Sequence, residues 1–210
     1  MEIRPIAGAL GAEISGVDLA KDLTDETVAA IRRAWLEHLV LFFRDQPLAP
    51  RDFLAFAKRF GEPIEYPFVK GLDDFPEIIP VLKRETEQVN FGGVWHSDTT
   101  YLDIPPMASM LVAREVPPAG GDTIFANQYL AYETLSAGMR RMLEPLQAVA
   151  SSLKADASKT REDRLKDSGR ADAKKEYVAS HPVVRVHPET GRRALYVNVA
   201  HTTHFDGMTP

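Results

Sequence analysis

Short apolar segments, most of them bounded by Gly or Pro, dominate this 210-residue chain. The first of them are punctuated by Gly8, Gly11 and Gly16, which predicts paired strands with tight turns. Further strands are predicted at 39–43, 78–82, 107–113, 182–187 and 194–199. The run at 39–43 has no polar member, so we expect it to be buried on both faces. Many short strands and few helices predict a mainly β fold with flanking helices (α+β), built as an antiparallel sandwich or barrel.

Three segments show helical periodicity. The first extends over 24–39, where Thr24 is a suitable N-cap and apolar residues recur at three- and four-residue steps. The second is predicted over 51–60 and the third over 128–147. The turn residues at 188–191 predict a β-hairpin between the last two apolar runs.

The composition limits the class of protein. Lys plus Arg total 25 and Asp plus Glu total 30, which gives a formal net charge of -5, and no basic block stands apart from acidic neighbours. We therefore expect no nucleic-acid partner. Without a signal peptide or a run of ~20 apolar residues, we expect a cytoplasmic protein with no membrane partner. The length predicts a single domain over 1–210, with two small domains as the alternative. The absence of cysteine means that a metal must bind through His, Asp or Glu.

One segment is unusually polar. Residues 154–176 hold 8 Lys or Arg and 6 Asp or Glu in 23 positions, with Leu165 as the only large apolar side chain. Such a segment has little to bury. We expect an exposed, charged insertion, with a lid as the functional alternative.

His96 and Asp98 form the most suggestive pair of polar residues. Residues two apart in an extended segment point to the same face, so imidazole and carboxylate can reach one ion together. Two His and one carboxylate form the facial triad that holds non-haem Fe(II). The spacing alone is weak evidence, since His204-Phe205-Asp206 repeats it. The first copy has the better context, because Trp95 and Tyr101 flank it with aromatic bulk that is able to shield a metal.

A second patch is the glycine pair before Thr123. Gly120 and Gly121 admit positive φ, and Asp122 or Thr123 can bond local backbone. This pattern is typical of a hairpin turn that enters a strand. In the functional interpretation, the Thr123 hydroxyl donates a hydrogen bond to a ligand carboxylate.

Four blocks together resemble the taurine/2,4-dichlorophenoxyacetate family of Fe(II)- and 2-oxoglutarate-dependent dioxygenases. They are IRPIAGALGAEISGVDL, LVLFFRDQPL, WHSDTTY with GGDTIFAN behind it, and HPVVRVHPETGRRALYVN. They occur in the family's order and are distributed over nearly the whole chain. The resemblance implies a double-stranded β-helix, or jelly roll. It also implies that His96 and Asp98 match the first two iron ligands and are catalytic, and that Thr123 matches the threonine that binds 2-oxoglutarate.

The implied reaction uses Fe(II), 2-oxoglutarate as cosubstrate and O2. It hydroxylates a small organic substrate, such as a sulfonate, a sulfate ester or an aryloxy acid, and releases succinate and CO2. The taurine enzyme presents a His and a Tyr to its substrate, whereas the matching register here has Tyr66 and Val69. Taurine itself is therefore disfavoured. Substrate-side contacts are expected from Tyr66, Asn90 and Thr99.

The family's third iron ligand and the Arg that pairs with 2-oxoglutarate lie beyond the 181–198 block, and no residue of this chain is assigned to either role. We therefore expect a jelly roll that is incomplete at its C-terminus. The alternative function is a non-catalytic subunit of the same fold, truncated or degenerate, that acts in binding or assembly. A mononuclear metal hydrolase is a third, weaker alternative, because no general base or bridging carboxylate supports it. Unpaired strands at a missing barrel edge predict a homo-oligomer.

Overall fold

The structure is a computed structural model that describes residues 1–83, 85–86, 92–154 and 175–209. The chain divides into two compact units. Unit 1 consists of Met1–Pro63 and Met110–Leu130, and unit 2 of Ile64–Ser109 and Ala131–Pro210. No helix in the described ranges has the length and apolar character that crossing a membrane requires. The charged segment predicted over 154–176 lies outside the described residues from 155 to 174.

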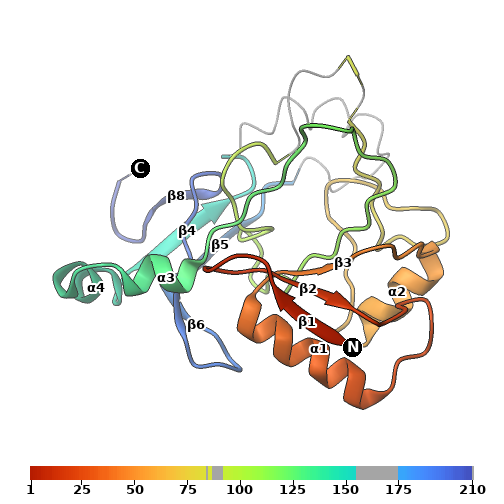
Figure 1. Cartoon of the computed structure of the whole chain (residues 1–210). Coiled ribbons are helices and arrows are strands. Elements are labelled where there is room, and N and C mark those ends of the chain that lie inside the picture. The colour runs from red at the N-terminus through yellow and green to blue at the C-terminus, as the bar shows by residue number, and fades with distance from the viewer. Residues whose placement is uncertain (84, 87–91, 155–174, 210) are drawn as a thin grey trace. The chain divides into compact units, whose positions relative to one another are not determined.

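Unit 1 contains a three-stranded sheet with β2 in the centre (Figure 1). β1 (Glu2–Pro5) pairs antiparallel with β2 (Ala12–Ser15), which confirms the predicted strand pair. β3 (Leu41–Phe43) pairs parallel with β2, and α1 (Asp25–His38) supplies the crossover that a parallel pair requires. The prediction that 39–43 is a strand buried on both faces was wrong. The strand is shorter, and its residues are half-buried because β3 lies at the edge of the sheet.

The two helices of unit 1 begin where the sequence predicts. The Thr24 hydroxyl accepts a hydrogen bond from the Thr27 amide at 3.3 Å and so caps α1. α2 (Pro50–Lys58) starts at its proline, whose missing N–H would be unpaired in a first turn in any case. Both helices pack apolar faces into the core, whose buried members are Ile14, Leu19, Ile31, Ala34, Leu48 and Phe56.

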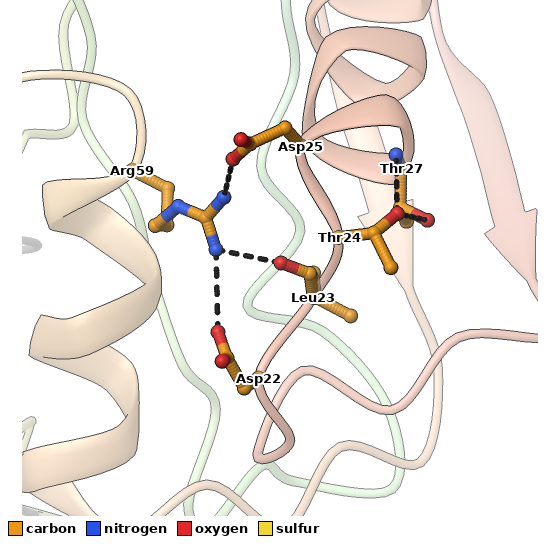
Figure 2. Close-up of polar contacts among 6 residues, drawn as sticks. All are labelled: Asp22, Leu23, Thr24, Asp25, Thr27 and Arg59. Atoms are coloured by element: carbon orange, nitrogen blue, oxygen red, sulfur yellow. Dashed lines mark hydrogen bonds and ion pairs between the residues drawn. The ribbon is translucent and has the colours of Figure 1, made fainter.

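Arg59, which follows α2, ties the end of this helix to the start of α1 (Figure 2). Its guanidinium donates to the Leu23 carbonyl at 2.7 Å and to the Asp25 carboxylate at 2.6 Å. A longer contact of 3.5 Å reaches Asp22. Because both carboxylates are almost fully exposed, the bond to the carbonyl contributes most to the tie.

Unit 2 contains an antiparallel sheet of three strands, in the order β5-β4-β8. β4 (Gln147–Ser151) lies between β5 (Val178–Pro182) and β8 (Thr202–Phe205). β6 (Val184–Val186) and β7 (Arg193–Leu195) form a separate antiparallel pair. This pair confirms the hairpin predicted around 188–191.

The single helix predicted over 128–147 was wrong. The structure has α3 (Gln128–Glu133) and α4 (Ala137–Leu143) instead. Local side-chain bonds compete with the helix between them. The Thr134 hydroxyl donates to the Ala131 carbonyl at 3.3 Å, and the Ser136 hydroxyl accepts from the Met139 amide at 3.2 Å, which starts α4 anew.

The strands predicted at 78–82 and 107–113 were also wrong. The Ile78 amide donates to the Phe75 carbonyl at 3.0 Å, so the first run starts in a local turn. In the second run, Met110 and Val112 pack against the core of unit 1 without a strand ladder. Apolar character therefore predicted neither strand pairing nor full burial here, since Val81 and Leu111 are 54% and 78% exposed.

Unit 2 has two apolar cores. One gathers Tyr132, Ala148, Val183 and Val184 between the helices and the strands. The other gathers Phe68, Tyr101 and Ala150, with Tyr66 and Tyr177 packed against it. Tyr101 is 1% exposed and lies three residues after Asp98, so this second core fixes the segment that carries the candidate metal ligands.

Candidate active site

The His96 side chain is oriented by the backbone just before it. Its Nδ1 lies 2.7 Å from the Val94 carbonyl, which can only accept, so Nδ1 carries the proton. Gly92 makes room for the ring: its φ is +74°, and a Cβ on it would lie 3.1 Å from His96 Cε1. With Nδ1 held on this carbonyl, Nε2 is the ring atom that would bind a metal, after losing the proton that it shares with Asp98 in the metal-free chain.

His96 and Asp98 come together as predicted. Nε2 of His96 lies 3.1 Å from Oδ1 of Asp98. Two ligand atoms that occupy adjacent corners of an octahedron with bonds of ~2.1 Å lie about 3 Å apart, so this separation fits one shared metal ion. The side chains are 31% and 53% exposed, respectively, which leaves the pair accessible to ligands.

Asp98 has a second partner that the sequence did not predict. The Ser109 hydroxyl donates to Oδ2 of Asp98 at 2.5 Å. The hydrogen bond from His96, with a further one from Ser109, lowers the pKa of the Asp98 carboxyl. The carboxylate is therefore ionised at neutral pH, as a metal ligand must be.

Thr99 follows the pair in a strained conformation. Its φ is +50°, which is unusual for a β-branched residue. The side chain is buried, and its hydroxyl has no hydrogen-bond partner among the described residues. Strain and an unsatisfied buried group are both concentrated at this one residue, which is a reason to ask for a functional role. This agrees with the expectation that Thr99 lies on the substrate side, which stays a prediction.

Two residues far along the chain anchor the turn after Asp98. The His181 Nε2 donates to the Leu102 carbonyl at 2.9 Å. The Asn198 amide donates to the Thr100 hydroxyl at 3.3 Å. Neither residue was predicted. The alternating burial of β5 places His181 on its buried face, a signal that was available, whereas nothing local singles out Asn198.

Aromatic rings connect Tyr66 to this segment. The Tyr101 hydroxyl lies 3.4 Å from that of Tyr66, and both rings pack edge to face on Phe68. His201 packs edge to face on Tyr101 and His96, at centroid distances of 4.9 and 6.4 Å. Of the two flanking aromatic residues, Tyr101 is buried and Trp95 is 54% exposed, so the expected shielding by Trp95 stays a prediction.

The second His-x-Asp copy forms no pair like that of His96 and Asp98 among the described residues. The second His-x-Asp copy differs in its contacts: Nδ1 of His204 lies 2.9 Å from the Thr203 hydroxyl, and no described ion pair joins His204 to Asp206. Across the residues that the structure describes, no cluster of three or more His, Asp or Glu is arranged to hold a metal. Asn90 lies outside the described residues.

Thr123 belongs to unit 1 and is exposed. It follows Gly120 and Gly121, whose φ angles of +80° and +71° agree with the expected turn. No strand follows in the described structure, so the hairpin alternative for this segment was wrong. Its role toward 2-oxoglutarate stays a prediction.

Comparison with known proteins places the chain in a family. Residues 2–210 match the family described as taurine catabolism dioxygenase TauD, TfdA family. An alpha-ketoglutarate-dependent sulfate ester dioxygenase of Pseudomonas putida is 37% identical over 202 residues, which cover 93% of this chain and 65% of that protein. An (S)-phenoxypropionate/alpha-ketoglutarate-dioxygenase of Sphingobium herbicidovorans is 31% identical over 225 residues, which cover 100% of this chain and 74% of that protein.

Solved structures agree. A taurine dioxygenase from Burkholderia xenovorans superposes with a TM-score of 0.79 at 36% identity, covering 100% of this chain and 67% of that one. The structure of AAD-2 in complex with Mn(II) and N-oxalylglycine superposes with a TM-score of 0.73 at 27% identity, covering 99% of this chain and 73% of that one. The chain thus spans just under two thirds of the length of the sulfate ester dioxygenase. Enzymes of this family depend on Fe(II), 2-oxoglutarate and O2. By sequence match and by fold, the chain belongs to the TauD/TfdA family of dioxygenases.

Proposed function

We propose that this chain carries the metal-binding part of an Fe(II)- and 2-oxoglutarate-dependent dioxygenase with a jelly-roll fold, forming a single domain over 1–210. The observation that carries the proposal is the 3.1 Å approach of His96 Nε2 to Asp98 Oδ1. The donors suit Fe(II), since imidazole and carboxylate form the facial triad of such oxygenases. The relatives' dependence on alpha-ketoglutarate supports the same chemistry.

In this proposal, His96 and Asp98 hold the iron and Thr123 donates its hydroxyl to the distal carboxylate of 2-oxoglutarate. N-oxalylglycine, the ligand of AAD-2, differs from 2-oxoglutarate by an N–H in place of a methylene. The bound iron with O2 and 2-oxoglutarate supplies the oxidation: one oxygen atom enters a substrate C–H bond, and the other enters succinate as CO2 leaves. The protein's own residues bind, orient and exclude water.

We propose a small anionic substrate, a sulfate ester or an aryloxy acid in preference to taurine. The names of the relatives support these classes, which share a negatively charged group. Tyr66 and Thr99 are able to contribute hydroxyl groups, and Asn90 an amide. The buried hydroxyl of Thr99 supports its part, because a substrate oxygen would satisfy it.

A non-catalytic role of the same fold is the second candidate. It is favoured by the ligand set, since no third His, Asp or Glu joins the pair among the described residues. Two donors hold a metal more weakly than three. Large apolar side chains in unit 1 support assembly into homo-oligomers: Leu111, Val116 and Ile124 are 78%, 69% and 68% exposed.

Anaerobic addition of Fe(II) and 2-oxoglutarate tests the enzyme proposal. A visible metal-to-ligand charge-transfer band should form with the native chain and be lost in His96→Ala. Admission of O2 with an alkyl sulfate or an aryloxy acid should then yield succinate in step with product. A band that is equally strong in His96→Ala would refute the assigned site, and a band without coupled turnover would favour the non-catalytic role.

A further inference from the structure

We propose that Ser109 is a positioning residue that holds Asp98 as a one-oxygen metal ligand. This inference rests on the proposed function of the His96–Asp98 pair. Each carboxylate oxygen of Asp98 has its own partner: Oδ1 faces His96 Nε2 at 3.1 Å, and Oδ2 accepts from Ser109 at 2.5 Å. Ser109 thereby decides which oxygen is presented to the metal.

The chemistry of a carboxylate makes such a partner consequential. A carboxylate binds a metal through one oxygen or through both, and it rotates about its terminal torsion at little cost. A hydroxyl donor on a charged oxygen forms a short, strong hydrogen bond of 2.5–2.7 Å, and the Ser109 bond lies in this range. Oδ2 is therefore occupied, and Oδ1 remains for the metal beside His96.

The chain between the two residues is stiff enough to deliver this contact. The Leu102 amide closes a turn on the Thr99 carbonyl at 2.9 Å, and His181 holds the Leu102 carbonyl. Pro105 and Pro106 then fix two successive φ angles before Ser109. The Ser109 hydroxyl is thus brought back to Asp98 by a segment with few soft torsions.

A purely structural role for this bond is disfavoured by its exposure. Ser109 is exposed, and the Asp98 side chain is 53% exposed, so water replaces a lost donor easily as far as folding is concerned. The orientation of the carboxylate is what water does not restore. Outer partners of metal ligands typically contribute 10- to 100-fold to metal affinity.

Titration with Mn(II) alone, followed by the electron paramagnetic resonance signal of the free ion, measures this contribution in the full chain. We expect Ser109→Ala to weaken Mn(II) binding by roughly 10- to 100-fold. Ser109→Thr keeps the hydroxyl and should restore binding to near the native value. Ser136→Ala is the matched control, because it removes an exposed serine hydroxyl of unit 2 that caps α4. It should leave Mn(II) affinity unchanged.

The outcomes separate the two proposals. If His96→Ala binds Mn(II) as well as the native chain does, the metal site itself is wrong. If His96→Ala loses binding while Ser109→Ala keeps it, the positioning role of Ser109 is refuted and the site stands. Circular dichroism and thermal unfolding of the metal-free variants complete the test. Should Ser109→Ala and Ser109→Gly both lose their fold together with affinity, the role of Ser109 is structural and the proposal is overturned.

Discussion

Gly92→Ala tests how far the position of His96 depends on the backbone before it. A Cβ at Gly92 would lie 3.1 Å from Cε1 and 3.7 Å from Nε2 of the imidazole. Ordinary contacts begin at 3.4 Å, so the ring must retreat by about 0.3 Å, the difference between 3.4 and 3.1 Å. This shift moves Nε2 relative to Asp98 and changes the separation that suits a shared metal ion.

The same substitution also strains the backbone, and Gly207 provides the control for that effect. The φ angles are +74° at Gly92 and +76° at Gly207, but a Cβ at Gly207 meets nothing within 4 Å. Alanine at such angles costs about 1–2 kcal/mol, of which ~0.4–1 kcal/mol returns through the lower entropy of the unfolded chain. We expect both variants to lose about 1 kcal/mol of unfolding free energy. Only Gly92→Ala should also lose roughly tenfold in Mn(II) affinity, or about 1.4 kcal/mol.

Urea unfolding of the metal-free chain measures the first quantity, and Mn(II) titration measures the second. The difference between the two glycine variants isolates the displacement of His96 from backbone strain. Equal Mn(II) affinities in Gly92→Ala and Gly207→Ala would refute the reasoning, because the ring would then tolerate the added methyl group without moving away from Asp98.

Three further changes have defined outcomes. Arg59→Met removes the guanidinium bond to a backbone carbonyl and should cost about 1–2 kcal/mol in urea unfolding, with Mn(II) affinity unchanged. Asn198→Ala removes the donor to Thr100 and should weaken Mn(II) binding roughly threefold or more, whereas Asn198→Gln, with the same amide on a longer arm, should recover part of it. Burial raises the pKa of Tyr196 above its usual 10.0. The unfolded chain therefore loses the Tyr196 phenol proton at a lower pH than the folded chain does. The contribution of Tyr196 to the free energy of unfolding is complete below pH 10 and declines as the pH rises through the pKa of the folded chain. Tyr196→Phe should flatten that part of an alkaline unfolding series.

Elements with complete local signals were predictable. α1 has an N-cap at Thr24, acidic residues in its first turn and a regular apolar face, and it forms as predicted. The 128–147 segment has the same periodicity, yet hydroxyl groups at Thr134 and Ser136 divide it into two helices. Periodicity reports which residues are buried and does not report such competing bonds.

The candidate site was predictable only where it is local. His96 and Asp98 are two residues apart, and their approach follows from short-range geometry. Ser109, His181 and Asn198 act on the same segment from 11 to 98 residues away in sequence. Such contacts depend on tertiary packing, so no spacing rule within one sequence reveals them.

The strain at Thr99 explains why these distant anchors matter. A non-glycine residue at positive φ costs on the order of 1–3 kcal/mol and persists only where the surroundings enforce it. After this residue, His181 holds the backbone at the Leu102 carbonyl, and Asn198 holds the Thr100 side chain at its hydroxyl. The Val94 carbonyl holds the His96 side chain, and the Ser109 hydroxyl holds the Asp98 side chain. The pair is thus ordered in the metal-free chain, so under the proposed function metal binding would not bear the cost of ordering these two side chains.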